Sequence, residues 1–244
     1  MVKIFAHRGS SGFYPENTMT AFLEAEKEQA DGIEMDVRFT NDRELVVIHD
    51  ETVDRTTDGK GKVSEYLLTD LKKLNAGANH PTSDKREEIL TLKEFLDWAY
   101  QTKLLLNIEL KYSKDTYLDY EQDVLKLLNK YNLGERLVIS SFNSKGLAKI
   151  ATLDPNIKLG LLYSKKIKKP IEFIRKMNIN ALHPSKKITS EKNIDEANNQ
   201  EIPIRVYTLN TEKEIKKYLA MNCSAIITDY PNRALEIKKK MKNK

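Results

Sequence analysis

Eight short apolar or β-branched runs recur along the chain, and each is followed by a segment of helical periodicity. We predict strands at residues 3–7, 32–37, 104–110, 137–141, 158–162, 181–183, 204–208 and 225–228. Between them, apolar residues stand three or four positions apart, from Met19, Phe22 and Leu23 after the first run to Ala234 and Ile237 after the last. This alternation predicts an α/β fold, the (β/α)8 or TIM barrel.

Signals at helix ends support several of these helices independently. The Thr-x-x-Glu sequences at 91–94 and 211–214 match the capping box, in which the first and last side chains each bond the other's backbone. Pro170 and Pro231 suit the first turn of a helix, where a missing N–H costs nothing.

One further apolar run, at 45–48, does not fit the count. Only residues 38–44 separate it from the second strand, too few for a crossover helix, so we predict an antiparallel hairpin. Pairing of Thr40 with Glu44 or Leu45 brings Asp36 opposite or next to His49. We interpret the polar stretch 51–88 as a small insertion over the barrel mouth.

Composition fits one domain, and we predict a single catalytic barrel over residues 1–244. With 40% hydrophobic residues, a chain of 244 residues buries one large core. The one cysteine, Cys223, lies beside an apolar run and reads as a buried thiol. No apolar stretch reaches the length of a membrane span and the chain starts directly with a strand, so we expect a cytoplasmic protein without stable membrane insertion.

The net charge of +5 raises the question of an anionic partner. Much of the excess lies in two lysine-rich segments, 165–169 and 238–244, which lack interleaved aromatic residues. We interpret both as solvated helix ends and expect no nucleic-acid partner. Weak attraction to an anionic membrane surface is the alternative.

Acidic residues gather at the ends of two predicted strands. Glu34 and Asp36 stand two apart, as do Glu109 and Lys111, so each pair projects to one side of its strand. Three converging carboxylates repel one another unless a cation offsets their charge. Their hard oxygen donors favour Mg²⁺ or Ca²⁺ over Zn²⁺.

Two alternative interpretations of these residues involve no bound cation. Glu34 and Asp36 could lie on the solvent-exposed face of an edge strand. In a barrel, however, the apolar residues that alternate with them must face the helices, which leaves the acids inside. Glu109 and Lys111 could instead form a buried ion pair.

Two of the four histidines, His7 and His49, follow predicted strands beside these acids. Imidazole gives or takes a proton near neutral pH, so a pair of them can serve as acid and base in one displacement. Cleavage of a phosphodiester needs both, together with positive charge of the kind that Arg8 and Lys111 supply. We expect His80 and His183 to be structural.

Short motifs also follow one another along almost the whole chain. They are His7-Arg8-Gly9, Pro15-Glu16-Asn17-Thr18, residues 32–37, His49-Asp50, Arg55-Thr56-Thr57, residues 107–111, Ser140-Ser141-Phe142, residues 206–210 and residues 227–231. In this order they resemble the glycerophosphodiester phosphodiesterase family.

The resemblance implies roles that agree with those suggested by residue type. It makes His7 and His49 the acid and base, has Glu34, Asp36 and Glu109 hold one divalent cation, Mg²⁺ or Ca²⁺, and has Arg8 and Lys111 hold the phosphate. It also places Phe142 and Tyr207 in the substrate pocket, with Tyr207 standing where tryptophan is usual. Glu16 and Asn17 match a family motif, and Asn17 is equally suited to capping the next helix.

The activity implied is metal-dependent hydrolysis of small glycerophosphodiesters to sn-glycerol 3-phosphate and an alcohol. The attacking group is either water or the substrate's own 2-hydroxyl, which would form a cyclic phosphate first. A lysophospholipase D acting on lysophospholipids and a non-catalytic barrel that binds glycerophosphodiesters are the alternatives. Head group, oligomeric state and the assignment of acid and base stay open.

Overall fold

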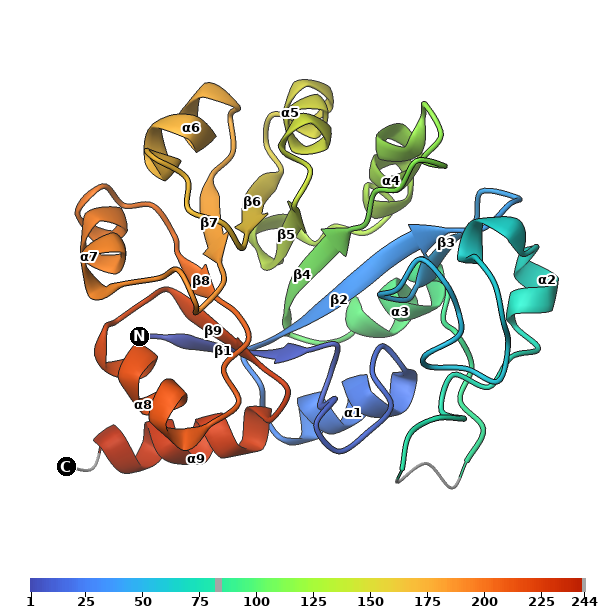
Figure 1. The fold of residues 1–244 in the computed structure, drawn as a ribbon, viewed down its shortest axis with the longest axis horizontal. Helices are drawn as coiled ribbons and strands as arrows, with labels where there is room; N and C mark the ends of the chain where they lie inside the picture. The colour runs from blue at the N-terminus through green and yellow to red at the C-terminus, as the bar shows by residue number, and fades with distance from the viewer. Residues whose placement is uncertain (82–84, 243–244) are drawn as a thin grey trace.

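A nearly closed barrel of eight parallel strands, surrounded by helices, forms the body of the molecule (Figure 1). The computed structural model describes residues 1–81 and 85–242. The strands are β1 (Lys3–His7), β2 (Gly32–Phe39), β3 (Leu45–Val47), β4 (Leu105–Leu110), β5 (Leu137–Ser141), β6 (Lys158–Tyr163), β7 (Ala181–Pro184), β8 (Arg205–Val206) and β9 (Ala225–Thr228). The helices are α1 (Met19–Lys27), α2 (Leu68–Leu71), α3 (Leu92–Ala99), α4 (Tyr120–Leu128), α5 (Ser144–Leu153), α6 (Pro170–Lys176), α7 (Glu191–Asn199), α8 (Glu212–Ala220) and α9 (Pro231–Lys242).

The strand order confirms the predicted barrel. Neighbours run β7-β6-β5-β4-β2-β1-β9-β8, all parallel, while β3 pairs with β2 outside this path. Between β7 and β8 the ring is joined by two isolated parallel bridges, Leu182 with Ile204 and Ser185 with Tyr207. Residues at the carboxyl ends of the strands therefore face one common mouth.

Two predicted strands are too long at their ends. β8 covers Arg205 and Val206 instead of 204–208, because the flanking residues meet β7 through isolated bridges and not through a continuous ladder. Leu104 precedes β4, and its amide donates to the Thr102 hydroxyl at 3.2 Å. The expectation for Leu23 is also wrong: its side chain is exposed on α1, whose buried residues are Ala21, Phe22 and Ala25.

The predicted helix caps are confirmed. Thr91 begins α3 and Thr211 begins α8 with complete capping boxes. Pro170 is the first residue of α6 and Pro231 the first of α9. These signals are local, so they do not depend on how the helices pack.

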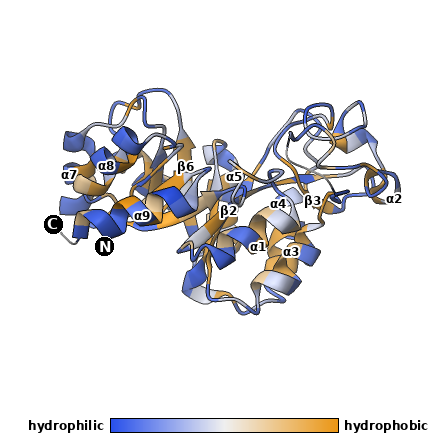
Figure 2. Ribbon diagram, turned by 90° about the horizontal axis from the view of Figure 1, so that it is seen from below, coloured by the Kyte–Doolittle hydropathy of each residue, from blue (hydrophilic) through white to orange (hydrophobic). Residues whose placement is uncertain are grey.

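Apolar side chains fill the space between the strands and the helices. On β2, Ile33, Met35 and Val37 are fully buried and belong to the main hydrophobic core. Figure 2 shows orange, hydrophobic residues on the strands and on parts of the helices around them. Because successive side chains alternate across a strand, Glu34 and Asp36 point the other way, into the barrel. Cys223 lies buried in the same core, as predicted.

The hairpin of β2 and β3 has the predicted register. Val37 pairs with Val47 and Phe39 with Leu45, and the Ile48 amide donates to the Asp36 carbonyl at 3.1 Å. His49 is the residue directly after Ile48. Asp36 and His49 are therefore held side by side through one local element.

Residues after the hairpin form an irregular stretch with its own small core. A 3₁₀ turn at Val63–Glu65 and the short helix α2 interrupt it, and Val53, Val63 and Leu71 pack against Val46 and Ile48. The division into one catalytic domain with an insertion at 51–88 stays a prediction. Residues 82–84 of that stretch and residues 243–244 of the basic tail lie outside the described part of the chain.

No helix within the described residues is long and apolar enough to cross a membrane.

Candidate active site

The turn after β1 places two predicted site residues at the barrel mouth. β1 ends at His7, and the next two residues, Arg8 and Gly9, have positive φ angles of 56° and 82°. A Cβ on Gly9 would lie 2.6 Å from the carbonyl carbon of Ala21 in α1, so the close approach of this turn to the helix requires glycine. The Arg8 amide donates to the Glu34 carbonyl at 2.8 Å, which ties the turn to β2.

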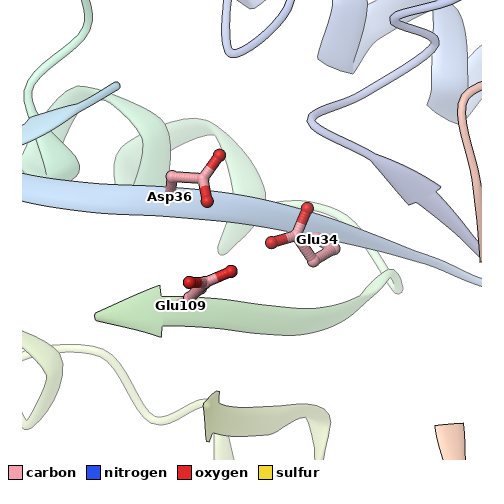
Figure 3. Close-up of side chains that lie close together, drawn as sticks. All are labelled: Glu34, Asp36 and Glu109. Carbon is pink, nitrogen blue, oxygen red and sulfur yellow. The ribbon is translucent and has the colours of Figure 1, made fainter. Parts of the chain in front are cut away.

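Three carboxylates from β2 and β4 converge inside the mouth (Figure 3). Glu34, Asp36 and Glu109 each offer an oxygen within 4.8 Å of the others, and all three side chains are buried. The parallel register sets Asp36 beside Glu109, and Glu34 stands two residues earlier on the same side. A cluster of hard oxygen donors around one point fits a hard divalent cation.

Two basic side chains partly offset the negative charge of this cluster. Lys111 Nζ lies 2.9 Å from Asp36 Oδ1 and also bonds Glu109, while Arg8 Nε lies 3.1 Å from Asp36 Oδ2. When all three carboxylates are ionised, they exceed the two cationic side chains by one negative charge. A divalent cation is the complement that this excess favours.

The carboxyl groups differ in their pKa values because their surroundings differ. Burial is the largest influence on Glu34, and together with the charges of Asp36 and Glu109 it holds the Glu34 pKa well above the usual range. Burial also raises the pKa of Glu109 to about 7, although Lys111 opposes the rise. For Asp36, burial is outweighed by Lys111 and Arg8, which hold its pKa well below the usual range.

Asn17 supports the cluster and does not cap the next helix. Thr18 is the N-cap of α1, where its hydroxyl accepts from the Ala21 amide. The Asn17 side chain donates from Nδ2 to Asp36 Oδ2 at 2.9 Å and accepts from the Asp36 amide at 3.4 Å. It thereby orients the Asp36 carboxylate, and the capping alternative is wrong.

Each of the two predicted site histidines has a carboxylate partner. His7 Nδ1 lies 2.6 Å from Asp229 Oδ1, and His49 Nδ1 lies 2.6 Å from Asp50 Oδ1. A carboxylate at Nδ1 fixes the ring orientation and favours the tautomer that leaves Nε2 to exchange a proton. His7 Nε2 lies 3.9 Å from Glu34 Oε2, so this edge of the ring faces the acidic cluster.

Burial lowers the pKa of His49, although the charge of Asp36 opposes the change. The Asp50 partner has a pKa of about 2, chiefly because it accepts a hydrogen bond from Arg55. Asp50 is therefore ionised at neutral pH and keeps its acceptor role toward the ring.

A chain of ion pairs links His49 back to Arg8. Arg55 donates to Asp50 at 2.6 Å and, through two nitrogens, to both oxygens of Glu16 at 2.7 Å. Glu16 in turn accepts from Arg8 at 2.8 Å. Bidentate pairs of this kind fix geometry, so Arg55 couples the stretch after the hairpin to the turn after β1.

A pocket of about 160 Å³ opens onto these groups. Its polar lining includes His7, Arg8, Glu34, His49, Asn107, Glu109 and Lys111, and its other lining residues are Phe142, Leu162, Tyr207, Thr208 and Ile227. Eight of the nine predicted site residues therefore border one cavity, and Asp36 lies directly behind it in contact with Lys111.

The two aromatic residues meet edge to face at one side of the pocket. The Phe142 and Tyr207 rings lie 6.2 Å apart at an interplanar angle of 88°, and the Tyr207 hydroxyl donates to the Tyr163 carbonyl at 3.3 Å. Phe142 is half exposed. The pair contributes aromatic surface to the lining of the pocket.

The other two histidines are not among the residues that line this pocket. His183 is fully buried with Nε2 3.1 Å from Arg205, and burial holds its pKa well below the usual range. His80 lies in the stretch 51–88.

No specific role for Asp229, Arg55 or Glu16 follows from the sequence alone, although each lies in one of the motifs that resemble the family. Asp229 follows β9 directly, level with His7 at the end of β1, because the preceding residues Ala6 and Thr228 pair in the parallel register. That position was the available signal for Asp229. For Arg55 there was none in the spacing, because its two partners come from different elements.

Comparison with known proteins gives the same family over the whole chain. The model of the "Glycerophosphoryl diester phosphodiesterase family" matches residues 7–233. A glycerophosphodiester phosphodiesterase of Bacillus altitudinis is 38% identical over 246 residues, covering 99% of this chain and 100% of that relative. One of Caldanaerobacter subterraneus subsp. tengcongensis is 35% identical, covering 97% and 98%.

A solved structure agrees with these relatives. It is that of an Oleispira antarctica phosphodiesterase in complex with the product sn-glycerol-3-phosphate, 28% identical, with a TM-score of 0.91 and coverage of 97% of this chain and 96% of that one. The chain belongs to the glycerophosphoryl diester phosphodiesterase family, which confirms both the resemblance of its motifs and the prediction of an enzyme.

Proposed function

We propose that this protein hydrolyses small glycerophosphodiesters to sn-glycerol 3-phosphate and an alcohol. The observation that carries the proposal is one pocket bordered by two carboxylate-paired histidines, two cationic side chains and the acidic cluster. Phosphodiester cleavage needs each of these parts: proton transfer in both directions and charge to match the phosphoryl oxygens.

Glu34, Asp36 and Glu109 would hold a single divalent cation, Mg²⁺ or Ca²⁺. When bound, the cation offsets negative charge on the phosphoryl group. Asp36 stays ionised because Lys111 and Arg8 stabilise its charge, and Asn17 keeps its carboxylate oriented. Glu34 and Glu109 must lose their protons to act as ligands.

His7 and His49 would move the two protons of the reaction. The attacking hydroxyl loses a proton to one imidazole as its oxygen bonds to phosphorus. The bond from phosphorus to the departing oxygen breaks, and the other imidazole protonates that oxygen. Asp229 and Asp50 hold the rings so that Nε2 of each is free for this exchange. Arg8 and Lys111 would bind the phosphate oxygens, with Phe142 and Tyr207 against the organic part.

The size of the pocket supports a small substrate over a lysophospholipid. About 160 Å³ suits a three-carbon polyol and its phosphate, whereas an acyl chain needs an extended apolar groove. Phe142 offers a single half-exposed ring, which does not form such a groove.

The direct test is a product panel. Purified protein is incubated with glycerophosphocholine, glycerophosphoethanolamine or lysophosphatidylcholine, with Mg²⁺, with Ca²⁺ and after exhaustive chelation. We expect sn-glycerol 3-phosphate from the first two substrates and none after chelation. Preferential turnover of lysophosphatidylcholine would establish the lysophospholipase D alternative, and full activity after chelation would exclude the cation site.

Histidine variants separate an enzyme from a binding module. His7→Ala and His49→Ala should each abolish turnover while binding of sn-glycerol 3-phosphate stays measurable, and His80→Ala is the control outside the pocket lining. Unchanged turnover in both site variants would refute the proposed mechanism. A substrate analogue without the 2-hydroxyl then distinguishes attack by water, which continues, from the cyclic route, which stops. The cytoplasmic location stays a prediction.

A further inference from the structure

The floor of the pocket carries one amide side chain that the proposed mechanism does not use. Asn107 is 1% exposed and lines the cavity. Within the described residues, neither its Nδ2 nor its Oδ1 has a hydrogen-bond partner. Leaving buried polar groups unbonded is costly, so both atoms of this amide point to a bonding partner that enters the pocket.

The position of Asn107 on β4 relates it to the proposed cation and phosphate groups. In the parallel register it lies beside Glu34, and it precedes Glu109 by two residues and Lys111 by four on the same side of the strand. Asn107 thus lies deeper in the barrel than Lys111, which we propose binds the phosphate. A ligand whose phosphate meets Lys111 would extend its organic part toward Asn107.

An amide offers a donor and an acceptor at adjacent atoms, and a hydroxyl group needs one of each. A phosphate oxygen uses only a donor and a cation only an acceptor, so either would leave half of Asn107 unbonded. Among the other lining residues, Phe142, Leu162 and Ile227 carry no side-chain donor, and the Tyr207 hydroxyl already donates to the Tyr163 carbonyl, which leaves Thr208 as the one further hydroxyl of the lining.

We propose that the side-chain amide of Asn107 recognises a hydroxyl of the glycerol moiety, donating from Nδ2 and accepting at Oδ1. The inference rests on the proposed function, since it names the residue that selects the glycerol part of that substrate. Selection follows because an analogue without the hydroxyl would leave the buried amide unbonded again.

The test measures binding, with saturating divalent cation present, of two ligands that differ only in hydroxyl groups: sn-glycerol 3-phosphate and n-propyl phosphate. Wild-type protein should bind the first about tenfold to hundredfold more tightly, as determined by titration calorimetry. In Asn107→Leu this ratio should fall to about one, with the affinity for n-propyl phosphate nearly unchanged. If the leucine variant does not fold, the same ratio is measured in Asn107→Ser.

Ser140→Ala is the matched control. Its hydroxyl is also buried and unbonded among the described residues, and it lies on the adjacent strand, but Ser140 is not among the pocket-lining residues. This variant should keep the wild-type ratio. The proposal is overturned if wild type does not discriminate the ligands, if the ratio survives in Asn107→Leu, or if that variant weakens both ligands equally.

Cation affinity separates selection of the hydroxyl from cation binding. Asn107→Leu should bind Mg²⁺ or Ca²⁺ like wild type, and a large loss would make Asn107 a cation ligand and overturn the proposal. Failure of the proposed function is recognised separately: wild-type protein would then release no sn-glycerol 3-phosphate from glycerophosphocholine, whatever the binding ratios.

Discussion

The position of Glu109 in the acidic cluster predicts that this residue lowers the stability of the cation-free protein. Burial and the charge of Asp36 raise its pKa to about 7, despite the neighbouring Lys111. We therefore expect Glu109→Gln to stabilise the cation-free protein at alkaline pH and, at the same time, to weaken cation binding. The neutral amide keeps the shape of the side chain but removes the buried negative charge.

The sign and size of this effect follow from the two pKa values. In the unfolded chain Glu109 titrates near 4.5, so between pH 4.5 and about 7 the folded protein binds more protons than the unfolded one. The contribution of Glu109 to stability is therefore lost as pH rises through this window. At about 1.4 kcal/mol for each pH unit, the loss amounts to about 3 kcal/mol.

Urea unfolding in the presence of a chelator measures this difference. The free energy of unfolding of Glu109→Gln minus that of wild type should be about 3 kcal/mol larger at pH 8 than at pH 5, so the variant is the more stable protein at alkaline pH. The other titrating groups are common to the two proteins. Glu34 reinforces the difference, because its pKa falls when the charge of Glu109 is removed. An equal difference at both pH values would refute the reasoning, because it would mean that Glu109 is ionised in the folded protein throughout.

Adding the cation supplies the internal control. Wild-type protein should gain stability with the logarithm of cation concentration, whereas Glu109→Gln, which lacks one of the proposed ligands, should gain less. The order of stability at pH 8 should therefore reverse at high Mg²⁺ or Ca²⁺. That result would mean that the native glutamate favours cation binding and lowers the stability of the cation-free protein.

Two other residues and one helix cap give further predictions. Asp229→Asn should lower kcat for glycerophosphocholine about tenfold to hundredfold with little change in KM, because His7 loses its charged partner; a change confined to KM would contradict this role. Gly9→Ala should lower the free energy of unfolding in urea by about 1–3 kcal/mol, since its Cβ would lie 2.6 Å from backbone of α1. Gly134→Ala, also at positive φ but with nothing within 4 Å, is its control and should cost less. Thr91→Ala should cost about 1 kcal/mol by the same measurement and Thr91→Ser much less, because the cap of α3 needs the hydroxyl.

Features that depend on short-range patterns could be predicted from the sequence. The barrel follows from the alternation of strand-like and helical periods, and the register of the β2–β3 hairpin follows from the seven residues available for its turn and edges. Glu34 and Asp36 face inward because apolar residues alternate with them. In each case the relevant neighbours lie within a few positions along the chain.

Features that depend on long-range packing could not be predicted. The partner of His7 is Asp229, 222 positions away, and nothing in local spacing connects the two. Asn17 fits a helix cap by residue type, yet Thr18 fills that place and frees Asn17 to hold Asp36. The short length of β8 depends on which backbone groups find partners in β7, which only the closed ring determines.

The junction of β7 and β8 is held by isolated bridges, unlike the other strand junctions of the barrel. Elsewhere around the ring neighbouring strands share ladders, but here two isolated bridges carry the connection, and Tyr207 in the pocket wall belongs to one of them. Local opening costs least where few backbone bonds must break. We expect amide hydrogen exchange to be faster along β8 than along β1 and β2. Local opening would then loosen the side of the pocket that Tyr207 lines more readily than the side formed by β2 and β4, where the three carboxylates lie.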